Sequence, residues 1–133
     1  MEQSFRLLIV DDQSRARQSL SALLMIDFPQ IELSEASDGK DALRQVEAIH
    51  PDIVVMDVLM PGGDGIEGTR SIKARYPIIK VILYSMYGEY ESAALAAGAD
   101  AFIMKGAPSE TLVAAIAGLA EAKTASSRSH EGD

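Results

Sequence analysis

The sequence contains no cysteine, and this absence excludes both disulfide bonds and metal sites built from thiolates. It also lacks an apolar run of the roughly 20 residues that a helix needs to cross a bilayer. The N-terminus has no basic segment leading into a long apolar stretch, so no signal peptide is predicted. Together these absences predict a soluble, cytoplasmic protein that does not act at a membrane.

Basic residues are scarce as well. The 12 lysines and arginines face 20 acidic residues, which gives a net charge of −8. A protein that binds a nucleic acid duplex usually gathers its basic residues in a patch, because neutralising phosphates supplies most of its affinity. Here the basic residues are scattered along the sequence. We therefore expect no nucleic-acid binding by this chain alone and favour a protein partner.

Short apolar runs alternate with helical patterns along the chain, which at 133 residues has the length of one domain. The runs are continuous and rich in Ile, Val and Leu, as is typical of parallel strands covered on both faces. Predicted strands begin near Phe5, Ile31, Asp52, Ile79 and Asp100. Helical patterns lie at residues 15–28, 66–75, 89–97 and 109–122, with one more between Asp38 and His50.

Capping and helix-breaking residues set the ends of these elements. Ser14 or Asp12 is expected to cap the first helix, because a side-chain oxygen there accepts a free N–H group of the first turn. Asp38 precedes the second helix, which ends at His50-Pro51. Residues 1–122 are expected to form the domain. The polar, Ser-rich tail at 123–133 is expected to be disordered.

Five alternating strand–helix units predict an α/β fold with a doubly wound, five-stranded parallel sheet. Sites in such sheets form beyond the carboxyl ends of the strands. Polar residues stand at four of these ends, namely Asp11 and Asp12, Asp57, Ser85 and Lys105. Three converging carboxylates repel one another, so the sequence predicts a bound cation.

The ordered set of motifs resembles the receiver domain of two-component response regulators. The matching residues are Ile9-Val10-Asp11-Asp12, Met56-Asp57-Val58-Leu59-Met60-Pro61-Gly62-Gly63-Asp64-Gly65, Ser85, and Gly98-Ala99-Asp100-Ala101-Phe102-Ile103-Met104-Lys105. The resemblance covers nearly the whole chain. It implies a flavodoxin-like (βα)5 sheet with strand order 2-1-3-4-5. It also implies a signalling switch that catalyses only its own phosphorylation and dephosphorylation.

The resemblance assigns a role to each residue of this group. Asp57 would accept a phosphoryl group from a sensor histidine kinase, because a carboxylate can form an acyl phosphate. Asp12, Asp57 and the backbone carbonyl of Leu59 would bind Mg²⁺ directly, with Asp11 acting mostly through water. Lys105 would be a point-charge partner for Asp57 and later for the phosphate.

Two further pairs have implied roles around the phosphate. Ser85 and Phe102 resemble the family's switch pair, in which a hydroxyl binds the phosphate and an aromatic ring moves into the space it leaves. Leu59 and Tyr87 occupy positions that flank the phosphate, and we expect both to hinder attack by water. Simpler interpretations stay open: Asp57 could cap the turn before Pro61, Asp12 could cap the first helix, and Phe102 could be a static core residue.

The output of such a switch is read on one face of the fold. The resemblance places it on the fourth helix, the fifth strand and the fifth helix, where an output protein or a second copy would bind. The length of the chain favours a stand-alone receiver. Residues 73–82 nevertheless resemble receivers joined to helix-turn-helix domains, so the regulatory half of a DNA-binding response regulator stays open.

A phosphatase with an aspartate nucleophile is the alternative from another functional class. Such enzymes typically carry Asp-x-Asp after the first strand. Here Asp11 and Asp12 are adjacent and Gln13 follows them, while the reactive candidate, Asp57, ends the third strand. A degenerate receiver that only binds partners is disfavoured, because the full set of acids, hydroxyl and lysine is present.

Overall fold

A computed structural model of the chain describes residues 4–61 and 64–131, and strands and helices alternate along them. The strands are β1 (Arg6–Val10), β2 (Glu32–Ala36), β3 (Ile53–Asp57), β4 (Lys80–Ser85) and β5 (Ala101–Met104). The helices are α1 (Ser14–Asp27), α2 (Gly39–Ile49), α3 (Gly65–Arg75), α4 (Glu91–Ala96) and α5 (Ser109–Glu131), with a short 3₁₀ helix, η1 (Gly88–Tyr90), leading into α4. No helix among the described residues is long and apolar enough to span a membrane.

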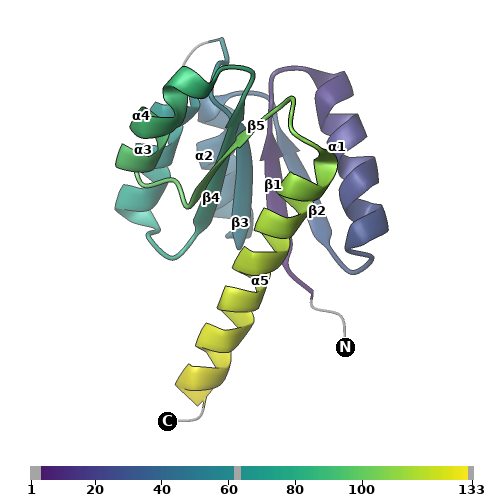
Figure 1. Ribbon diagram of the computed structural model, residues 1–133. Helices are drawn as coiled ribbons and strands as arrows, with labels where there is room; N and C mark the ends of the chain where they lie inside the picture. The colour runs from purple at the N-terminus through teal and green to yellow at the C-terminus, as the bar shows by residue number, and fades with distance from the viewer. Residues whose placement is uncertain (1–3, 62–63, 132–133) are drawn as a thin grey trace.

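The five strands form one parallel sheet in the order β2-β1-β3-β4-β5. Helices α1 and α5 cover one face, and α2, α3 and α4 cover the other (Figure 1). The chain leaves β1 toward β2 on one side and later returns to β3 on the other side. The carboxyl ends of β1 and β3 therefore meet at the switch in strand order, where such sheets build their sites. The predicted α/β fold and the implied strand order are confirmed.

The three central strands β1, β3 and β4 are buried on both faces along most of their length, and their residues alternate between two core clusters. On β3, Ile53 and Val55 pack with residues of α1 and α5, whereas Val54 and Met56 pack with residues of α2, α3 and α4. Asp57 follows the same alternation as Ile53 and Val55. Its side chain therefore lies on the face that α1 and α5 cover, at the carboxyl end of the strand.

The predicted positions of the elements agree closely with the structure. Every strand begins one residue after its predicted start. Asp38 caps α2, since its Oδ1 accepts the N–H of Asp41 at 2.8 Å. The helix ends at His50, which adopts the left-handed conformation with φ of 47°. The fourth helix begins with the 3₁₀ turn of η1 and ends before Gly98, whose φ is also positive.

Two predictions about helix ends were wrong. Neither Ser14 nor Asp12 caps α1; the cap is Gln13, which makes no side-chain capping bond. The Asp11 carboxylate takes the nearby N–H of Gln13 instead, at 2.9 Å. The last helix was expected to end near Ala122, yet α5 continues to Glu131, so residues 123–131 are helical. No proline or glycine follows Gly118 before Gly132, so the segment contains no residue that would stop a helix.

Candidate functional site

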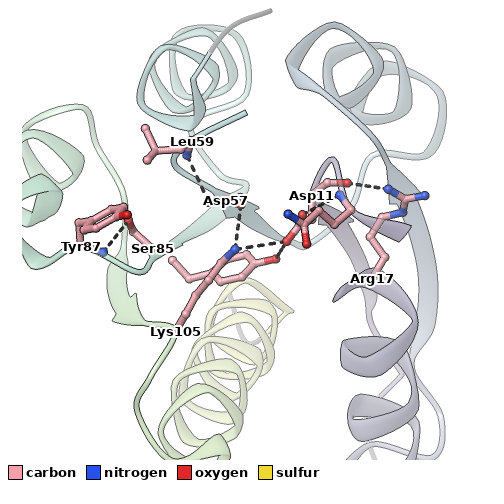
Figure 2. A network of polar contacts seen from close by, with 9 residues as sticks. Asp11, Arg17, Asp57, Leu59, Ser85, Tyr87 and Lys105 are labelled. Atoms are coloured by element: carbon pink, nitrogen blue, oxygen red, sulfur yellow. Dashed lines mark hydrogen bonds and ion pairs between the residues drawn. The ribbon is translucent and has the colours of Figure 1, made fainter. Parts of the chain in front are cut away.

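Three charged residues meet at the edge of the sheet that the carboxyl ends of the strands form. Asp11 follows β1, Asp57 ends β3 and Lys105 follows β5. All three continue the alternation that faces α1 and α5, so their side chains converge (Figure 2). The Lys105 ammonium Nζ lies 2.8 Å from Asp57 Oδ2 and 3.5 Å from Asp11 Oδ2. The predicted convergence of acids and a lysine at this edge is confirmed.

The carboxylates form a compact acidic cluster. Asp11, Asp12 and Asp57 each offer one oxygen, and these oxygens lie within 4.8 Å of one another. Asp11 and Asp57 are buried, at 1% and 7% exposure, while Asp12 is exposed. Lys105 is the cation that pairs with the cluster among the described residues, so one positive charge faces three negative ones. Negative charges this close repel one another, so the cluster favours the binding of a further cation.

The Asp57 carboxylate is oriented from two sides. Its Oδ1 accepts the backbone N–H of Leu59 at 3.2 Å, and its Oδ2 accepts from the Lys105 ammonium (Figure 2). The first contact is a turn of the kind that a loop aspartate makes with the residue two positions later. Asp57 thus supports the local turn and also forms the ion pair with Lys105. The interpretation that it only caps the turn before Pro61 therefore does not account for all of its contacts.

Sequence reasoning missed Tyr84, which lies directly under the cluster. Its hydroxyl donates to Asp11 Oδ2 at 2.6 Å, and Lys105 Nζ lies 4.7 Å from the centroid of its ring. Burial, followed by the hydrogen bond to Asp11 and the charges of the neighbouring carboxylates, raises the pKa of Tyr84 far above its ordinary value. The alternation along β4 would have found this residue, since Ile82 faces α1 and α5 and Tyr84 follows two positions later.

Sequence reasoning also missed Arg17, because it was counted among the basic residues that are scattered along the chain. Its guanidinium Nη1 donates to the backbone carbonyl of Asp11 at 2.6 Å (Figure 2). Its Nε pairs with Glu35 at 2.8 Å. The arginine therefore connects α1 to the ends of β1 and β2. No short sequence motif signals this contact, because it depends on how α1 lies across the sheet edge.

Ser85 and Phe102 lie on the opposite face of the sheet from Lys105. Ser85 is buried, and its Oγ accepts the backbone N–H of Tyr87 at 3.1 Å. Phe102 is partly buried against the cluster covered by α2, α3 and α4, as is Tyr90. Leu83 and Phe102 are paired in register. Phe102 thus lies beside β4 two residues before Ser85, and a coupled movement of the two stays a prediction.

Leu59 and Tyr87 both present exposed side chains at this edge, at 44% and 54% exposure. Leu59 contacts Asp57 through its backbone N–H. The ring of Tyr87 packs edge-on against Tyr90, with centroids 6.5 Å apart. The predicted metal contact of the Leu59 carbonyl stays a prediction. Gly62 and Gly63, which belong to the same motif, lie outside the described residues.

Comparisons with known proteins agree with this geometry. Residues 7–117 match the response regulator receiver domain family. The transcriptional regulatory protein DegU of Brevibacillus brevis is 30% identical over 118 residues, which cover 86% of this chain and 50% of DegU. Among solved structures, a LuxR-family two-component response regulator from Aurantimonas sp. SI85-9A1 superposes with a TM-score of 0.85 and 30% identity, over 90% of this chain and 87% of that one.

A second solved structure is that of the response regulator TrrA from Thermotoga maritima, described as a complex with Mg²⁺-BeF. It is 29% identical to this chain, with a TM-score of 0.79, over 90% of this chain and 99% of that one. The chain spans about half the length of the curated relatives it matches.

Proposed function

The chain belongs to the response regulator receiver domain family, and from this premise we propose that Asp57 accepts a phosphoryl group from the phosphohistidine of a sensor histidine kinase. The observation that carries the proposal is the Asp57–Lys105 contact of 2.8 Å inside a cluster of three carboxylates. A buried carboxylate held this way has one ammonium beside the oxygen that would react. We place the transfer in the cytoplasm.

The transfer needs little covalent chemistry from the protein. An oxygen of Asp57 attacks the phosphorus, the bond from phosphorus to the histidine nitrogen breaks, and an acyl phosphate forms. The Lys105 ammonium offsets negative charge on the phosphoryl oxygens, and the N–H of Leu59 holds the carboxylate in place. Catalysis by positioning and charge is typical of phosphoryl transfer.

The acidic cluster fits Mg²⁺, which prefers oxygen ligands and is typically held by one or two carboxylates together with phosphate. Asp12, Asp57 and the Leu59 carbonyl would hold it directly. Both oxygens of Asp11 already accept hydrogen bonds, which favours contact through water for this residue. When bound, the ion supplies charge that draws the phosphate toward three acids. The Mg²⁺-BeF complex of TrrA supports this assignment by analogy.

The phosphorylated state is proposed to act through the α4–β5–α5 face. Large apolar side chains are exposed on it or beside it, namely those of Met86, Tyr87, Leu95 and Met104. Ser85 would donate to the phosphate, and Phe102 would change its packing in response. The readout would be binding of an output protein or a second copy. Since DegU is named a transcriptional regulatory protein and this chain spans half of it, the regulatory half of a DNA-binding regulator is the second candidate.

Incubation with Mg²⁺ and acetyl phosphate, followed by intact mass measurement, tests the proposal. We expect a phosphoryl adduct on the wild type and none on Asp57→Asn. Asp27→Asn is the matched control, because Asp27 is an exposed acid at the far end of α1. Equal labelling of wild type and Asp57→Asn would overturn the assignment. Steady turnover of p-nitrophenyl phosphate would instead favour the phosphatase alternative.

A further inference from the structure

Tyr84 occupies a position that the proposed transfer does not use. It is paired in register with Asp57 across β3 and β4, so both side chains share one face of the sheet. Only 8% of the residue is exposed. Its hydroxyl contacts Asp11 and its ring lies beside Lys105. A tyrosine inside a cluster of charged groups is therefore in contact with two of them at once.

The hydroxyl completes the hydrogen bonds of a buried carboxylate. Asp11 Oδ1 accepts the N–H of Gln13 at 2.9 Å, and Asp11 Oδ2 accepts the O–H of Tyr84 at 2.6 Å. A buried carboxylate oxygen without a donor is strongly unfavourable, so it attracts whatever donor lies within reach. The next donor in reach is the Lys105 ammonium, 3.5 Å from the same Oδ2.

Lys105 thus lies between two carboxylates that compete for it. Its ammonium is 2.8 Å from Asp57 and 3.5 Å from Asp11, so the stronger contact is with the proposed phosphoryl acceptor. The Tyr84 ring beneath the ammonium adds an attractive aromatic surface on the same side. The neutral hydroxyl satisfies Asp11 without adding charge to the cluster.

We propose that Tyr84 is a positioning residue: its hydroxyl satisfies Asp11 and thereby leaves the Lys105 ammonium on Asp57. This inference rests on the proposed function. Loss of the hydroxyl draws Lys105 toward Asp11. The lysine then leaves the acid that should accept the phosphoryl group, and the charge of the ammonium lies farther from the oxygen that should react.

The test compares Mg²⁺ affinity, measured by calorimetry, with phosphorylation kinetics in four variants. Tyr84→Phe keeps the ring and removes only the hydroxyl, and we expect it to lower kcat/KM with acetyl phosphate by about tenfold or more without raising the Mg²⁺ Kd, because a buried carboxylate that loses a donor draws the ammonium away from Asp57. Tyr76→Phe is the matched control, because Tyr76 packs near His50, away from the acids, and both measures should stay at wild-type values.

The pair Lys105→Met and Tyr84→Phe/Lys105→Met separates positioning from a general structural effect. If Tyr84 acts by keeping Lys105 off Asp11, the tyrosine change leaves kcat/KM with acetyl phosphate within about twofold once the ammonium is absent. The same loss in both backgrounds, or no loss in the wild-type background, overturns the inference. In either case labelling of the wild type at Asp57 leaves the proposed function standing. Absence of both Mg²⁺ binding and labelling in the wild type overturns the two together.

Discussion

Single residues set the chemistry of the site, and the central one is Asp57, for which Lys105 and the proposed Mg²⁺ would compete. Lys105 already lies 2.8 Å from its Oδ2, and a divalent ion would need oxygens of the same cluster. The ammonium and the proposed Mg²⁺ would therefore repel each other while they share Asp57 as a ligand. Because of this competition, removing Lys105 and removing a proposed Mg²⁺ ligand should change the Mg²⁺ Kd in opposite directions.

Lys105→Met should tighten Mg²⁺ binding and slow phosphorylation, because it removes a positive charge from the cluster and a partner from the phosphate. Asp12→Asn should instead weaken Mg²⁺ binding and raise the Mg²⁺ Kd by at least about tenfold, since it removes a proposed direct ligand. Calorimetric titration of both variants against the wild type checks this. Weaker Mg²⁺ binding in Lys105→Met would contradict the proposed competition.

The lifetime of the phosphoryl group should depend on Leu59 and Tyr87. Both side chains are exposed at the site edge, where they can limit the approach of water. Leu59→Asn and Tyr87→Ala should shorten the half-life by up to about tenfold, which corresponds to about 1.4 kcal/mol of barrier. Decay of the adduct followed by intact mass provides the measurement, with Met86→Ala as the control on a neighbouring exposed side chain. Unchanged lifetimes in both variants would contradict the prediction that these side chains hinder the approach of water.

At the scale of elements, the start of α3 packs closely against the backbone of Asp57. The N–H of Gly65 donates to the Val58 carbonyl at 2.7 Å. A Cβ at Gly65 would lie 2.2 Å from the Asp57 carbonyl oxygen and 2.9 Å from Leu83 Cδ2. Since backbone is the nearest obstacle, α3 cannot carry a side chain here without moving. The helix thereby fixes the turn that follows Asp57.

Gly65→Ala should consequently destabilise the fold by about 1–3 kcal/mol, the usual cost of forcing extra volume into a packed site. Gly118→Ala is the matched control on α5, where a Cβ meets nothing within 4 Å. That change should stabilise by about 0.5–1 kcal/mol, because alanine is the better helix former. Urea unfolding of the two variants gives both values. An unchanged free energy of unfolding in Gly65→Ala would show that α3 can shift to accommodate the methyl group.

At the scale of the whole molecule, the periodic patterns of the sequence were sufficient to predict the sheet and its helices. Short apolar runs and capping residues such as Asp38 act locally, so they can be recognised without the fold. The contact of Tyr84 with Asp11 could not be recognised this way, because it joins strands far apart in the chain. The contact of Arg17 with Asp11 joins neighbouring elements but depends on how α1 lies across the sheet edge. The cap of α1 was missed for a local reason: the Asp11 carboxylate accepts the N–H of Gln13, and the helix begins after Gln13 without a side-chain cap.

The charge of the whole chain links metal binding to folding. With a net charge of −8 and three acids at one edge, the folded state should gain stability from Mg²⁺. At a free concentration 100 times Kd the gain should be about 2.7 kcal/mol, seen as a higher midpoint in urea. NaCl at matched ionic strength should give a smaller shift. An equal shift with both salts would indicate general screening instead of a site.

The most direct test of the account locates the phosphoryl group itself. After incubation with acetyl phosphate and Mg²⁺, borohydride reduction converts an aspartyl phosphate to homoserine, and peptide mass spectrometry finds the converted position. We expect conversion at Asp57, none without Mg²⁺, and none at Asp11 or Asp12. Conversion at another acid, or an adduct on the protein that resists reduction, would contradict the claim that Asp57 is the acceptor.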